Sequence, residues 1–531
     1  QKVTELNPNY ADGFNNLGAA LHDQGKPDEA IEAYKNALSF KPDDAETHYN
    51  MGVTLQEQGN LDKAVKAYQK AITLKPDYAG AYNNMGHALK DQGMLEEAIA
   101  AYKKALSLEP NNAEVYNKMG NALKEHEQLE EALEAYNKAI ILKPDYADAH
   151  NNMGVALQGQ GKLEEAIKAY KKALSLRPDY AEPYNNMGNA LKEQGKLEEA
   201  IKAYKKALSL KPDYAEAHLH LGFAFLSSGR VEEGLNEYEW RWKTTKFLSS
   251  WRHFPQPVWD GKKDLKGKRI LLWCEQGVGD TINWSSCLSF VASLAEYCIL
   301  ECHEKLVPLL SRSFPNVHIK AESRNLDPKR DDFDYHMPMG SLYRYFLSEI
   351  SQNARPDAFL VPDKARVNFW RARLNSIGNG PYVGISWKSS NMSLARLSNY
   401  AAISAWSPLF TIPNITFINL QYKDFENDLS KIKSEFDVKV HNFDDLDHYD
   451  DLDNVAALSA ALDFVVSVKN TVPLITAGVG TPTKLANWRQ SSWSNFLLNP
   501  VGPAVDIFEK NTWEPWDNVF SLIAEDISKS T

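Results

Sequence analysis

A short stretch at residues 271–282, with the sequence LLWCEQGVGDTI, places one acid beside a glycine turn. Its apolar residues predict a buried strand, and the glycines that follow predict a turn into a helix. Backbone N–H groups converge at such a helix N-terminus and suit an anion, for instance a phosphate or a carboxylate. Gln276, Gly277 and Gly279 lie in this turn, and Asp280 stands at its mouth. The pattern leaves two roles open for Asp280, a catalytic base or a cap of the helix.

Alternating strands and helices are predicted around this turn. A first half has expected strands at residues 269–274, 297–301, 317–321 and 334–337 and expected helices at residues 280–295, 304–313 and 367–376. A second half has expected strands at residues 382–387, 415–420, 438–441, 464–468 and 483–486 and expected helices at residues 429–435, 454–461 and 472–478. Strands that alternate with helices form parallel sheets. Two such halves bind a ligand in the cleft between them, at the carboxyl ends of their strands.

The first strand of the second half leads into a candidate phosphate site. Lys388 and Ser389 follow directly after the strand predicted at residues 382–387. A cation at this place stabilises negative charge that develops on a leaving phosphate. A surface lysine is the alternative, but a position at the end of a buried strand favours the phosphate site.

Two later segments are candidates for the same site. Asn470, Thr471 and Val472 begin a predicted helix, so their N–H groups and hydroxyl suit a diphosphate. An ordinary N-cap is the alternative. Trp488 and Arg489 follow the next strand, where arginine suits a phosphate or a sugar acid and tryptophan suits a sugar ring or a base. Packing of an aromatic loop explains this pair equally well.

The first half of the chain is a repeat array with a spacing of 34 residues. Prolines recur at Pro8, Pro42, Pro76, Pro110, Pro144, Pro178 and Pro212. Glycines recur at Gly18, Gly52, Gly86, Gly120, Gly154, Gly188 and Gly222, and tyrosines at Tyr34, Tyr68, Tyr102, Tyr136, Tyr170, Tyr204 and Tyr238. This is the tetratricopeptide pattern, in which two antiparallel helices form each repeat of an α-solenoid. Six repeats run to Pro212, and a divergent seventh follows.

A second glycine series is predicted to end the first helix of each repeat as a left-handed cap. Its members are Gly25, Gly59, Gly93, Gly161, Gly195 and Gly229. Glu127 stands at the equivalent place in the fourth repeat. Because a residue with a Cβ is strained there, the fourth repeat is expected to have a less favourable turn.

One position of the first helices is mostly asparagine and is expected to line the concave groove. The series is Asn16, Asn50, Asn84, Lys118, Asn152 and Asn186. An asparagine can bind a peptide backbone with both parts of its amide, whereas it is a poor helix former. We therefore predict a groove that binds an extended protein segment, with a consensus residue of no binding role as the alternative. The ladder resembles the one in protein O-GlcNAc transferases, which also join such repeats to a glycosyltransferase.

The α/β region resembles a family of glycosyltransferases over residues 250–531. The resemblance rests on Gly277-Val-Gly-Asp280, on Val383-Gly-Ile-Ser-Trp387-Lys388, and on Val466-Ser-Val-Lys-Asn-Thr-Val472 with Gly480-Thr-Pro482. The family is the metal-independent ADP-heptose lipopolysaccharide heptosyltransferase type. The chain resembles more closely the bacterial proteins that fuse tetratricopeptide repeats to such a domain, flagellin glycosyltransferases among them.

This resemblance implies a GT-B fold that uses a nucleotide sugar and requires no metal or further cofactor. Asp280 would take the proton of the acceptor hydroxyl, and Lys388 would stabilise the leaving phosphate. Lys469 stands where many members have Asp, and Leu474 stands where a His is usual. The donor is therefore open to a CMP-linked as well as a diphosphate-linked sugar. A dinucleotide fingerprint is a weaker rival, because residue 282 is Ile and not Gly.

Composition narrows the remaining classes of protein. A net charge of −11 argues against a general nucleic-acid binder. No apolar run is long enough for a bilayer and the first residues lack a signal-peptide pattern, so a cytoplasmic protein is expected. The sequence begins inside a repeat, so residues upstream are expected to be missing.

Cys274, Cys287, Cys298 and Cys302 lack partners at metal-site spacing and are predicted to be buried thiols. An acidic run at residues 444–453 lacks the pattern of a Ca²⁺ loop and is predicted to be a helix-capping turn.

The sequence therefore predicts a repeat superhelix at residues 1–246, a strap at 247–267, an acceptor-side half at 268–378 and a nucleotide-sugar half at 379–531. We predict an inverting, metal-independent glycosyltransferase that moves a sugar from a nucleotide to Ser or Thr of a protein held in the groove, such as flagellin. Two alternatives stay open. One is a scaffold whose α/β half binds a nucleotide or a glycan without turnover, and the other is a transferase with a glycan acceptor.

Overall fold

The computed structural model describes residues 10–323, 330–346, 358–389, 400–488, 505–510 and 515–530. It contains two compact units. One comprises Gln1–Glu193 with Lys205–Pro212, and the other comprises Gln194–Tyr204 with Asp213–Thr531. Arg489 and part of the loop after Ser389 lie outside the described residues.

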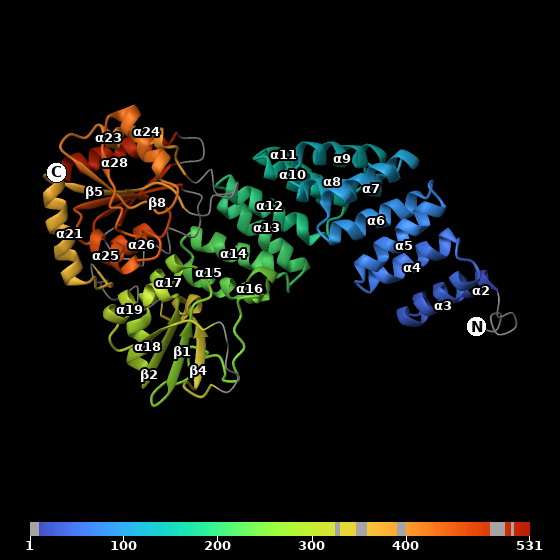
Figure 1. Cartoon of the computed structure of the whole chain (residues 1–531), viewed down its shortest axis with the longest axis horizontal. Coiled ribbons are helices and arrows are strands. Elements are labelled where there is room, and N and C mark those ends of the chain that lie inside the picture. Colours follow the sequence, from blue (N-terminus) through green and yellow to red (C-terminus); the bar gives the residue numbers. More distant parts are fainter. Residues whose placement is uncertain are drawn as a thin grey trace. The chain divides into compact units, whose positions relative to one another are not determined.

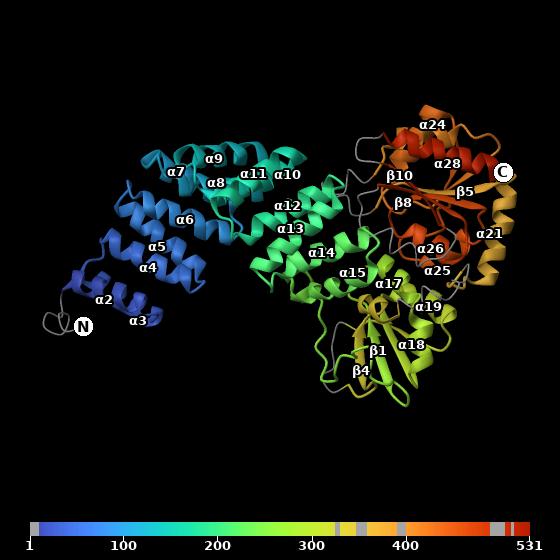
Figure 2. The same cartoon turned by 180° about the vertical axis from the view of Figure 1, so that it is seen from behind.

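Pairs of antiparallel helices build the first unit (Figures 1 and 2). The pairs are α2 (Ala11–Asp23) with α3 (Pro27–Phe40), α4 (Ala45–Glu57) with α5 (Leu61–Leu74), α6 (Ala79–Asp91) with α7 (Leu95–Leu108), α8 (Ala113–Glu125) with α9 (Leu129–Leu142), and α10 (Ala147–Gly159) with α11 (Leu163–Leu176). A further pair, α12 (Ala181–Glu193) with α13 (Leu197–Leu210), contains the boundaries between the two units. The helix pairs predicted from the repeat spacing are confirmed.

The first-helix glycine of a repeat permits close contact with the tyrosine of the second helix. A Cβ atom added at Gly18, Gly120 or Gly154 would lie 2.5 Å from a tyrosine ring of the same repeat. These rings are almost completely buried. Any larger residue would force the two helices of the repeat apart, which explains why the glycine and tyrosine series recur together.

The turn of the fourth repeat has the strain that its sequence predicts. Glu127 has a φ of 62°, whereas Gly93 and Gly161 have φ angles of 80° and 76° at the equivalent places. The backbone therefore takes the same left-handed conformation whether or not glycine is present. Non-glycine residues lose about 1–2 kcal/mol in this conformation.

Replacing Glu127 by Gly is therefore expected to stabilise the array by roughly 0.5–1 kcal/mol, after the entropic cost of glycine. All of the 13 tryptophans follow residue 239, so circular dichroism at 222 nm reports mainly on the repeats and tryptophan fluorescence reports on the rest of the chain. The variant should raise the urea midpoint of the first signal and leave the second unchanged. The reciprocal change Gly93→Glu should lower the first midpoint, and an unchanged midpoint in both variants would contradict the argument.

The second unit begins with the last repeat and a four-stranded parallel sheet. The repeat consists of α14 (Ala215–Ser227) and α15 (Val231–Tyr238), followed by η1 (Glu239–Lys243) and α16 (Thr245–Leu248). The strands are β1 (Arg269–Trp273), β2 (Tyr297–Cys302), β3 (His318–Ala321) and β4 (Tyr335–Pro338), in the order β3-β2-β1-β4. The helices are α17 (Val278–Ser285), α18 (Leu288–Leu294), η2 (Glu304–Leu306), α19 (Val307–Ser313) and η3 (Met339–Ser341).

The helix predicted at residues 280–295 is wrong in one respect, because it is divided into α17 and α18. The hydroxyl of Ser285 donates to the carbonyl of Ile282, and the hydroxyl of Ser286 donates to the carbonyl of Asn283. Serine hydroxyls that bind nearby carbonyls compete with the helix ladder. This pair of serines is therefore a local cause of the break.

The two faces of the first sheet are covered differently. Alternate residues of β1 such as Ile270 and Leu272 pack in the same core as α17, α18 and α19. On the other face, Leu271 and Trp273 pack with aromatic residues that precede the sheet in sequence. Trp251 meets the ring of Trp273 edge-on at 5.7 Å. The segment at 247–267, predicted to be a strap, contributes Trp251 and Phe254 to this packing.

A six-stranded parallel sheet forms the rest of the unit. Its strands are β5 (Tyr382–Ser386), β6 (Thr416–Asn419), β7 (Val440–His441), β8 (Phe464–Val468), β9 (Thr483–Trp488) and β10 (Val505–Lys510), in the order β10-β9-β8-β5-β6-β7. Its helices are α21 (Lys364–Ile377), η4 (Ile403–Trp406), α23 (Ser407–Phe410), α24 (Glu426–Phe436), α25 (Leu452–Ser459), α26 (Val472–Gly478) and α28 (Trp516–Ser530). This is the strand order of a doubly wound fold, in which the order reverses between β5 and β8.

Helix α21 was expected in the first half but is attached to the second. The Trp370 indole N–H donates to Asn454 Oδ1 of α25 at 2.7 Å, and Arg366 pairs with Asp451 at 3.3 Å. The boundary predicted at residue 378 therefore separates this helix from α25 of the second half, which it contacts. Among the described helices, none is long and apolar enough to cross a membrane.

Candidate functional site

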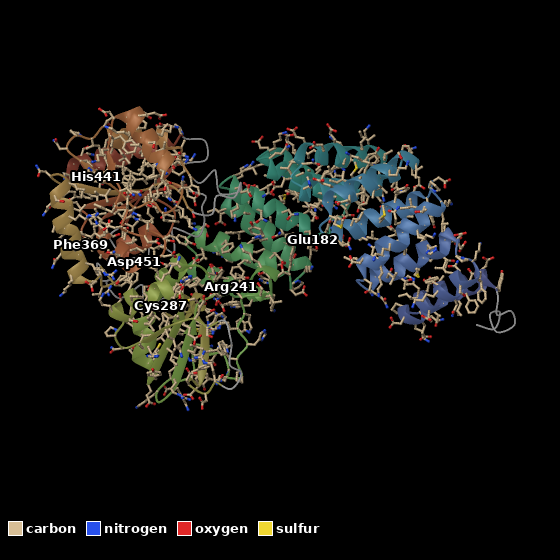
Figure 3. All side chains as sticks on the ribbon, in the orientation of Figure 1. Glu182, Arg241, Cys287, Phe369, His441 and Asp451 are labelled. Carbon is tan, nitrogen blue, oxygen red and sulfur yellow. The ribbon has the colours of Figure 1, made fainter. Side chains whose placement is uncertain are left out.

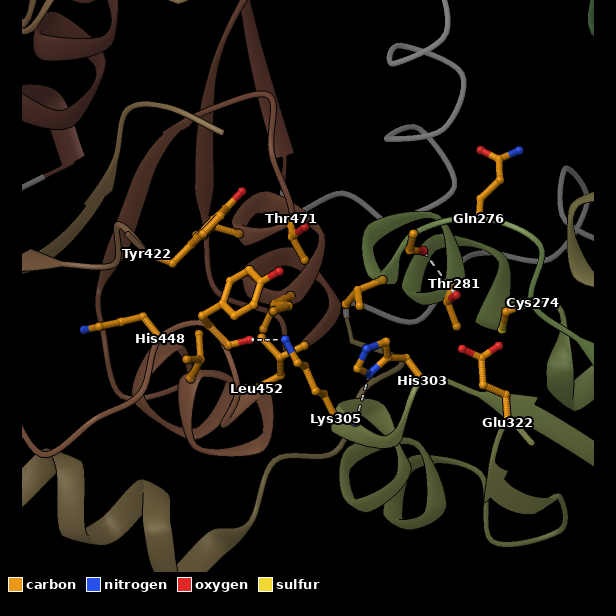
Figure 4. Close-up of a pocket in the computed structure, with 16 residues that line it drawn as sticks. Cys274, Gln276, Thr281, His303, Lys305, Glu322, Tyr422, His448, Leu452 and Thr471 are labelled. Atoms are coloured by element: carbon orange, nitrogen blue, oxygen red, sulfur yellow. Dashed lines mark hydrogen bonds between the residues drawn. The ribbon is translucent and has the colours of Figure 1, made fainter. Parts of the chain in front are cut away.

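A pocket of about 350 Å³ lies between the carboxyl ends of the two sheets (Figure 4). The first half contributes Cys274, Gln276, Gly277, Val278, Thr281, His303, Lys305 and Glu322. The second half contributes Tyr422, His448, Tyr449, Leu452, Val455, Thr471, Val472 and Ile475. Parallel α/β sheets bind ligands at this edge because helix N-termini and loops meet there. Of the residues predicted from sequence, Gln276, Gly277, Thr471 and Val472 line the pocket.

Two lysines lie beside Tyr449, which lines this pocket; Lys305 lines the pocket as well, whereas Lys423 does not. Lys305 Nζ lies 3.6 Å from the ring centre of Tyr449, and Lys423 Nζ lies 3.7 Å from the same centre. Lys305 also pairs with Asp450 at 2.5 Å and donates to the carbonyl of Tyr449 at 3.1 Å. Tyr422 stands 6.1 Å from Tyr449, ring centre to ring centre. Aromatic rings beside ammonium groups suit a ligand that combines a flat ring with negative charge.

The sequence did not reveal this aromatic and cationic cluster. Lys305 belongs to η2 of the first half, whereas Lys423 and Tyr449 follow strands of the second half. Each is an ordinary surface residue type at the end of a strand, so only the folded chain brings them together. The available signal was their common position after predicted strands, where ligands of parallel sheets bind.

His448 lines the pocket as a neutral residue. Its side chain is almost fully buried, and within the described chain neither ring nitrogen has a hydrogen-bond partner. Burial lowers the pKa of His448 to about 4, and the nearby charge of Asp447 opposes this only in part. The ring therefore stays uncharged at neutral pH and adds no positive charge to the pocket.

The glycine turn brings the starts of α17 and α26 together. A Cβ atom added at Gly279 would lie 3.2 Å from Leu474 Cδ1 and 3.4 Å from Thr471 Oγ1. At Gly277 the nearest atom, Asp280 Oδ2, would be 3.9 Å away. Because Gly279 has no side chain, the two halves can approach each other closely at this point. Leu474 packs against this glycine.

Asp280 lies in the first turn of α17 and not at its N-cap. The helix begins at Val278 with Gly277 as the N-cap residue, so the strict N-cap role is excluded. Asp280 is partly exposed, and it is absent from the pocket lining within the described chain. Its negative charge acts on Tyr238 of the last repeat. A carboxylate in this turn interacts favourably with the helix dipole, so its position is compatible with a base and with a structural role.

Lys388 has a protein partner. Its Nζ lies 2.7 Å from Asp428 Oδ2 and 2.6 Å from the carbonyl oxygen of Asp424. Its backbone N–H donates to Gln421 Oε1 at 3.0 Å. The lysine therefore stands after β5 as predicted, with its charge directed to a carboxylate of the same half. Ser389 follows it and is partly exposed.

Asn470 connects β5 with the start of α26. Its Nδ2 donates to Ser386 Oγ at 2.8 Å and to the carbonyl of Lys388 at 3.1 Å. Its Oδ1 accepts from the Val472 N–H at 2.9 Å. Asn470 precedes the N-cap residue Thr471, which makes no side-chain cap bond, and it satisfies the first backbone N–H of the helix. Thr471 and Val472 line the pocket. Trp488 ends β9, and Arg489 lies outside the described residues.

The asparagine series of the repeats forms hydrogen bonds from one repeat to the next. The bonds run from Asn50 to Asn15 (3.2 Å), Asn84 to Tyr49 (3.0 Å), Asn152 to Asn117 (3.0 Å) and Asn186 to Asn151 (3.0 Å). Lys118 interrupts them, and the buried Oδ1 of Asn83 has no partner among the described residues. The ladder therefore has a structural role of its own. Each amide carries two hydrogens and two acceptor positions, so this role is compatible with peptide binding.

The cysteines are free thiols. Cys287, Cys298 and Cys302 are buried and Cys274 is partly buried. Burial raises the pKa of Cys298 to about 12, so this thiol stays protonated. Over the described residues, no group of three or more His, Cys, Asp or Glu side chains is arranged to hold a metal ion.

Comparisons with known proteins establish the repeats. A family model described as TPR repeat matches residues 20–59, 55–93, 86–127, 120–161, 159–195 and 188–229, and a model described as tetratricopeptide repeat matches residues 1–32. Protein FlbA of Caulobacter vibrioides is 32% identical over 286 residues, which are 51% of this chain and 48% of FlbA. The chain thus spans about half the length of this curated relative. It contains tetratricopeptide repeats, a module that binds protein partners.

Two solved structures resemble part of the chain. The crystal structure of MamA is 31% identical, with 31% of this chain and 97% of that chain covered at a TM-score of 0.30. A structure described as YrrB, "a TPR protein with an unusual peptide-binding site", is 27% identical, with 35% of this chain and 96% of that chain covered at a TM-score of 0.31.

Proposed function

We propose that this chain is a glycosyltransferase that moves a sugar from a nucleotide donor to a protein acceptor recruited by the repeats. The observation that carries the proposal is the meeting of the two sheets at one pocket. The glycine turn after β1 and the start of α26 after β8 both line it. Each follows a strand at which the strand order reverses, where doubly wound folds bind nucleotides.

The chemistry of the pocket supports a nucleotide sugar as its ligand. Tyr422 and Tyr449 offer rings for a base or a sugar, and Lys305, which also pairs with Asp450, brings a cation to the lining. Asp280, in the first turn of α17, is the proposed base that takes the acceptor proton. The GT-B fold, the inverting outcome and the protein acceptor follow from the resemblance of the three motifs.

A module that binds a nucleotide or a glycan without turnover is the second candidate. The pairing of Lys388 with Asp428 at 2.7 Å favours it, because a lysine that is already paired stabilises a leaving phosphate less well. This candidate shares the ligand with the first and differs from it only in turnover. Binding and transfer therefore have to be measured separately.

A thermal-shift screen of UDP-, GDP-, ADP- and CMP-linked sugars on the full chain tests the binding step. A donor at a hundred times its Kd should stabilise the protein by about 2.7 kcal/mol. Replacing Tyr449 by Ala should reduce this shift, because the ring is 39% exposed at the pocket and its loss leaves the core intact. Tyr297→Ala is a matched control, since this tyrosine is 43% exposed and does not line the pocket.

The outcomes separate the candidates. Stabilisation by one donor class, followed by release of its nucleotide when acceptor is added, supports the transferase. Stabilisation without release supports the binding module. If no donor changes the thermal unfolding of the wild-type chain, or if Tyr449→Ala and Tyr297→Ala behave alike, the nucleotide-sugar pocket is wrong.

A further inference from the structure

In the second, fourth and fifth repeats the hydroxyl of the series tyrosine donates a hydrogen bond to the first helix of its own repeat, to Asn121 in the fourth and to a glutamine in the other two. The hydroxyl of Tyr68 donates to Gln56 Oε1 at 2.8 Å, and the hydroxyl of Tyr170 donates to Gln158 Oε1 at 2.9 Å. In both cases the acceptor stands on the first helix, twelve residues before the tyrosine. These bonds satisfy a buried hydroxyl inside the array.

The last repeat differs from these three repeats. Twelve residues before Tyr238 the chain has Leu226, which offers no side-chain acceptor. The ring of Tyr238 is as buried as those of the other repeats, with 1% of its surface exposed. Its hydroxyl accepts a hydrogen bond from the side-chain amide of Gln276 instead. Gln276 belongs to the glycine turn that follows β1. The hydroxyl of Tyr238 therefore contacts the candidate site.

A neighbouring residue holds the same turn. Arg241, labelled in Figure 3, follows Tyr238 by one helical turn and is fully buried. Its Nη2 donates to Glu275 Oε1 at 3.1 Å and to Ser341 Oγ at 2.8 Å. Glu275 also accepts from the Gly340 N–H at 3.1 Å. Two consecutive residues at the glycine turn, Glu275 and Gln276, are thus bound by a side chain of η1 and by a side chain of the last repeat, respectively.

The negative charge of Asp280 acts on the hydroxyl of Tyr238. Burial raises the pKa of Tyr238, and the charges of Glu275 and Asp280 raise it further while Arg241 opposes them. The hydroxyl therefore stays protonated at neutral pH and keeps its hydrogen. Between Gln276 and Asp280 the chain has only the two glycines and Val278, so a displaced Gln276 changes the direction of the carboxylate.

We propose that Tyr238 is a positioning residue for the transfer reaction, because its hydroxyl holds Gln276 and thereby the turn that carries Asp280. The inference rests on the proposed function for the reaction itself. It assigns the last repeat to the reaction site as well as to the array. The sequence does not indicate this role, because Tyr238 stands at the same position of its repeat as the other tyrosines of the series.

The test compares Tyr238→Phe with Tyr170→Phe in the full chain. Both changes remove one hydroxyl from a buried tyrosine of the same series, but only the first removes a bond to the turn. Hydrogen exchange of the backbone at residues 274–281 should become faster in Tyr238→Phe and stay unchanged in Tyr170→Phe. This readout needs no substrate.

Kinetics with the donor found in the thermal-shift screen give the second readout. Tyr238→Phe should lower kcat by about 10- to 100-fold with little change in the KM of the donor, because a misplaced group loses rate more than affinity. Tyr170→Phe should keep the wild-type kcat. The double variant Tyr238→Phe/Gln276→Ala should be no slower than the slower single variant, because both changes break the same bond.

The two proposals fail in different ways. Unchanged exchange of residues 274–281 in Tyr238→Phe, a wild-type kcat, or losses that multiply in the double variant would overturn the positioning role. A wild-type chain that releases no nucleotide, in which the turn nevertheless exchanges faster after Tyr238→Phe, would overturn the transferase and leave the positioning contact established.

Discussion

Replacing Asp280 by Asn is expected to lower kcat for sugar transfer by about 100- to 10,000-fold, because the amide cannot accept the proton of the acceptor hydroxyl. Asn has nearly the same shape as Asp, so the first turn of α17 should keep its conformation. Donor binding, measured by thermal shift, should therefore change little. The rate is best measured as nucleotide release in the presence of acceptor.

Glu322 is the other acid that could act as the base, so its variant provides the comparison for Asp280→Asn. Glu322 follows β3 and lines the pocket, whereas Asp280 is not among the lining residues that the structure describes. Glu322→Gln should lower the rate far less, because Glu322 is exposed at the end of an outer strand and can exchange its contacts for water. If Glu322→Gln abolishes transfer and Asp280→Asn preserves it, the base is Glu322 and the resemblance has assigned the wrong acid.

The repeats could be predicted from the sequence in detail because their contacts recur at a fixed spacing. Gly18 and Tyr34 touch within one repeat, and the same contact returns in its neighbours. The strained turn at Glu127 could also be predicted, because a residue other than glycine at this position of the series must adopt the left-handed conformation. Local contacts of this kind leave a periodic signal in the sequence.

The strands and helices of the second unit were predictable where an apolar run was bounded by turn residues. Two elements were missed at the C-terminal end, β10 and α28. The signal of α28 was present, since Val519, Phe520, Ile523 and Ile527 are buried on one face at helical spacing. The strand β10 follows a segment with few apolar runs, so its pairing with β9 depends on the fold.

Partners of side chains were the part that the sequence did not reveal. Lys388 pairs with Asp428, forty residues later, and Gln276 binds Tyr238, thirty-eight residues earlier. When several helices and strands lie between two residues, their separation in the sequence does not predict the distance between their side chains. For the same reason the cluster of Lys305, Lys423 and Tyr449 could not be foreseen. The motifs pointed to particular strand ends, but not to the atoms that meet there.

Removing the buried cation Arg241 is expected to be the most destabilising single change. Arg241 and Glu275 form an ion pair at 3.1 Å in which both side chains are completely buried. Breaking a buried pair by removing one partner costs about 3–5 kcal/mol, because the remaining charge is left in a poorly solvating environment. Arg241→Met should lower stability by this amount. Arg177→Met, which breaks an exposed pair with Asp148 at 2.9 Å, should cost less than about 1 kcal/mol.

The loss should depend on pH with a definite sign. Burial raises the pKa of Glu275 to about 7, although Arg241 and the Gly340 N–H oppose this effect. The folded chain therefore keeps a proton on Glu275 at pH values where the unfolded chain has lost it, and stability falls as pH rises between those two pKa values. Without Arg241 the opposing charge is gone, so the pKa of Glu275 rises further. Arg241→Met should consequently be more destabilising at pH 8 than at pH 5.

Urea unfolding followed by tryptophan fluorescence measures this effect in the right part of the chain, since all of the tryptophans follow residue 239. A second change, Glu275→Gln, removes the stranded charge while its side-chain oxygen can still accept from Gly340. The double variant Arg241→Met/Glu275→Gln should therefore recover a large part of the lost stability, and its dependence on pH should be weaker. Equal losses at pH 5 and pH 8, or a double variant no more stable than Arg241→Met, would show that packing rather than the buried charge makes Arg241 necessary.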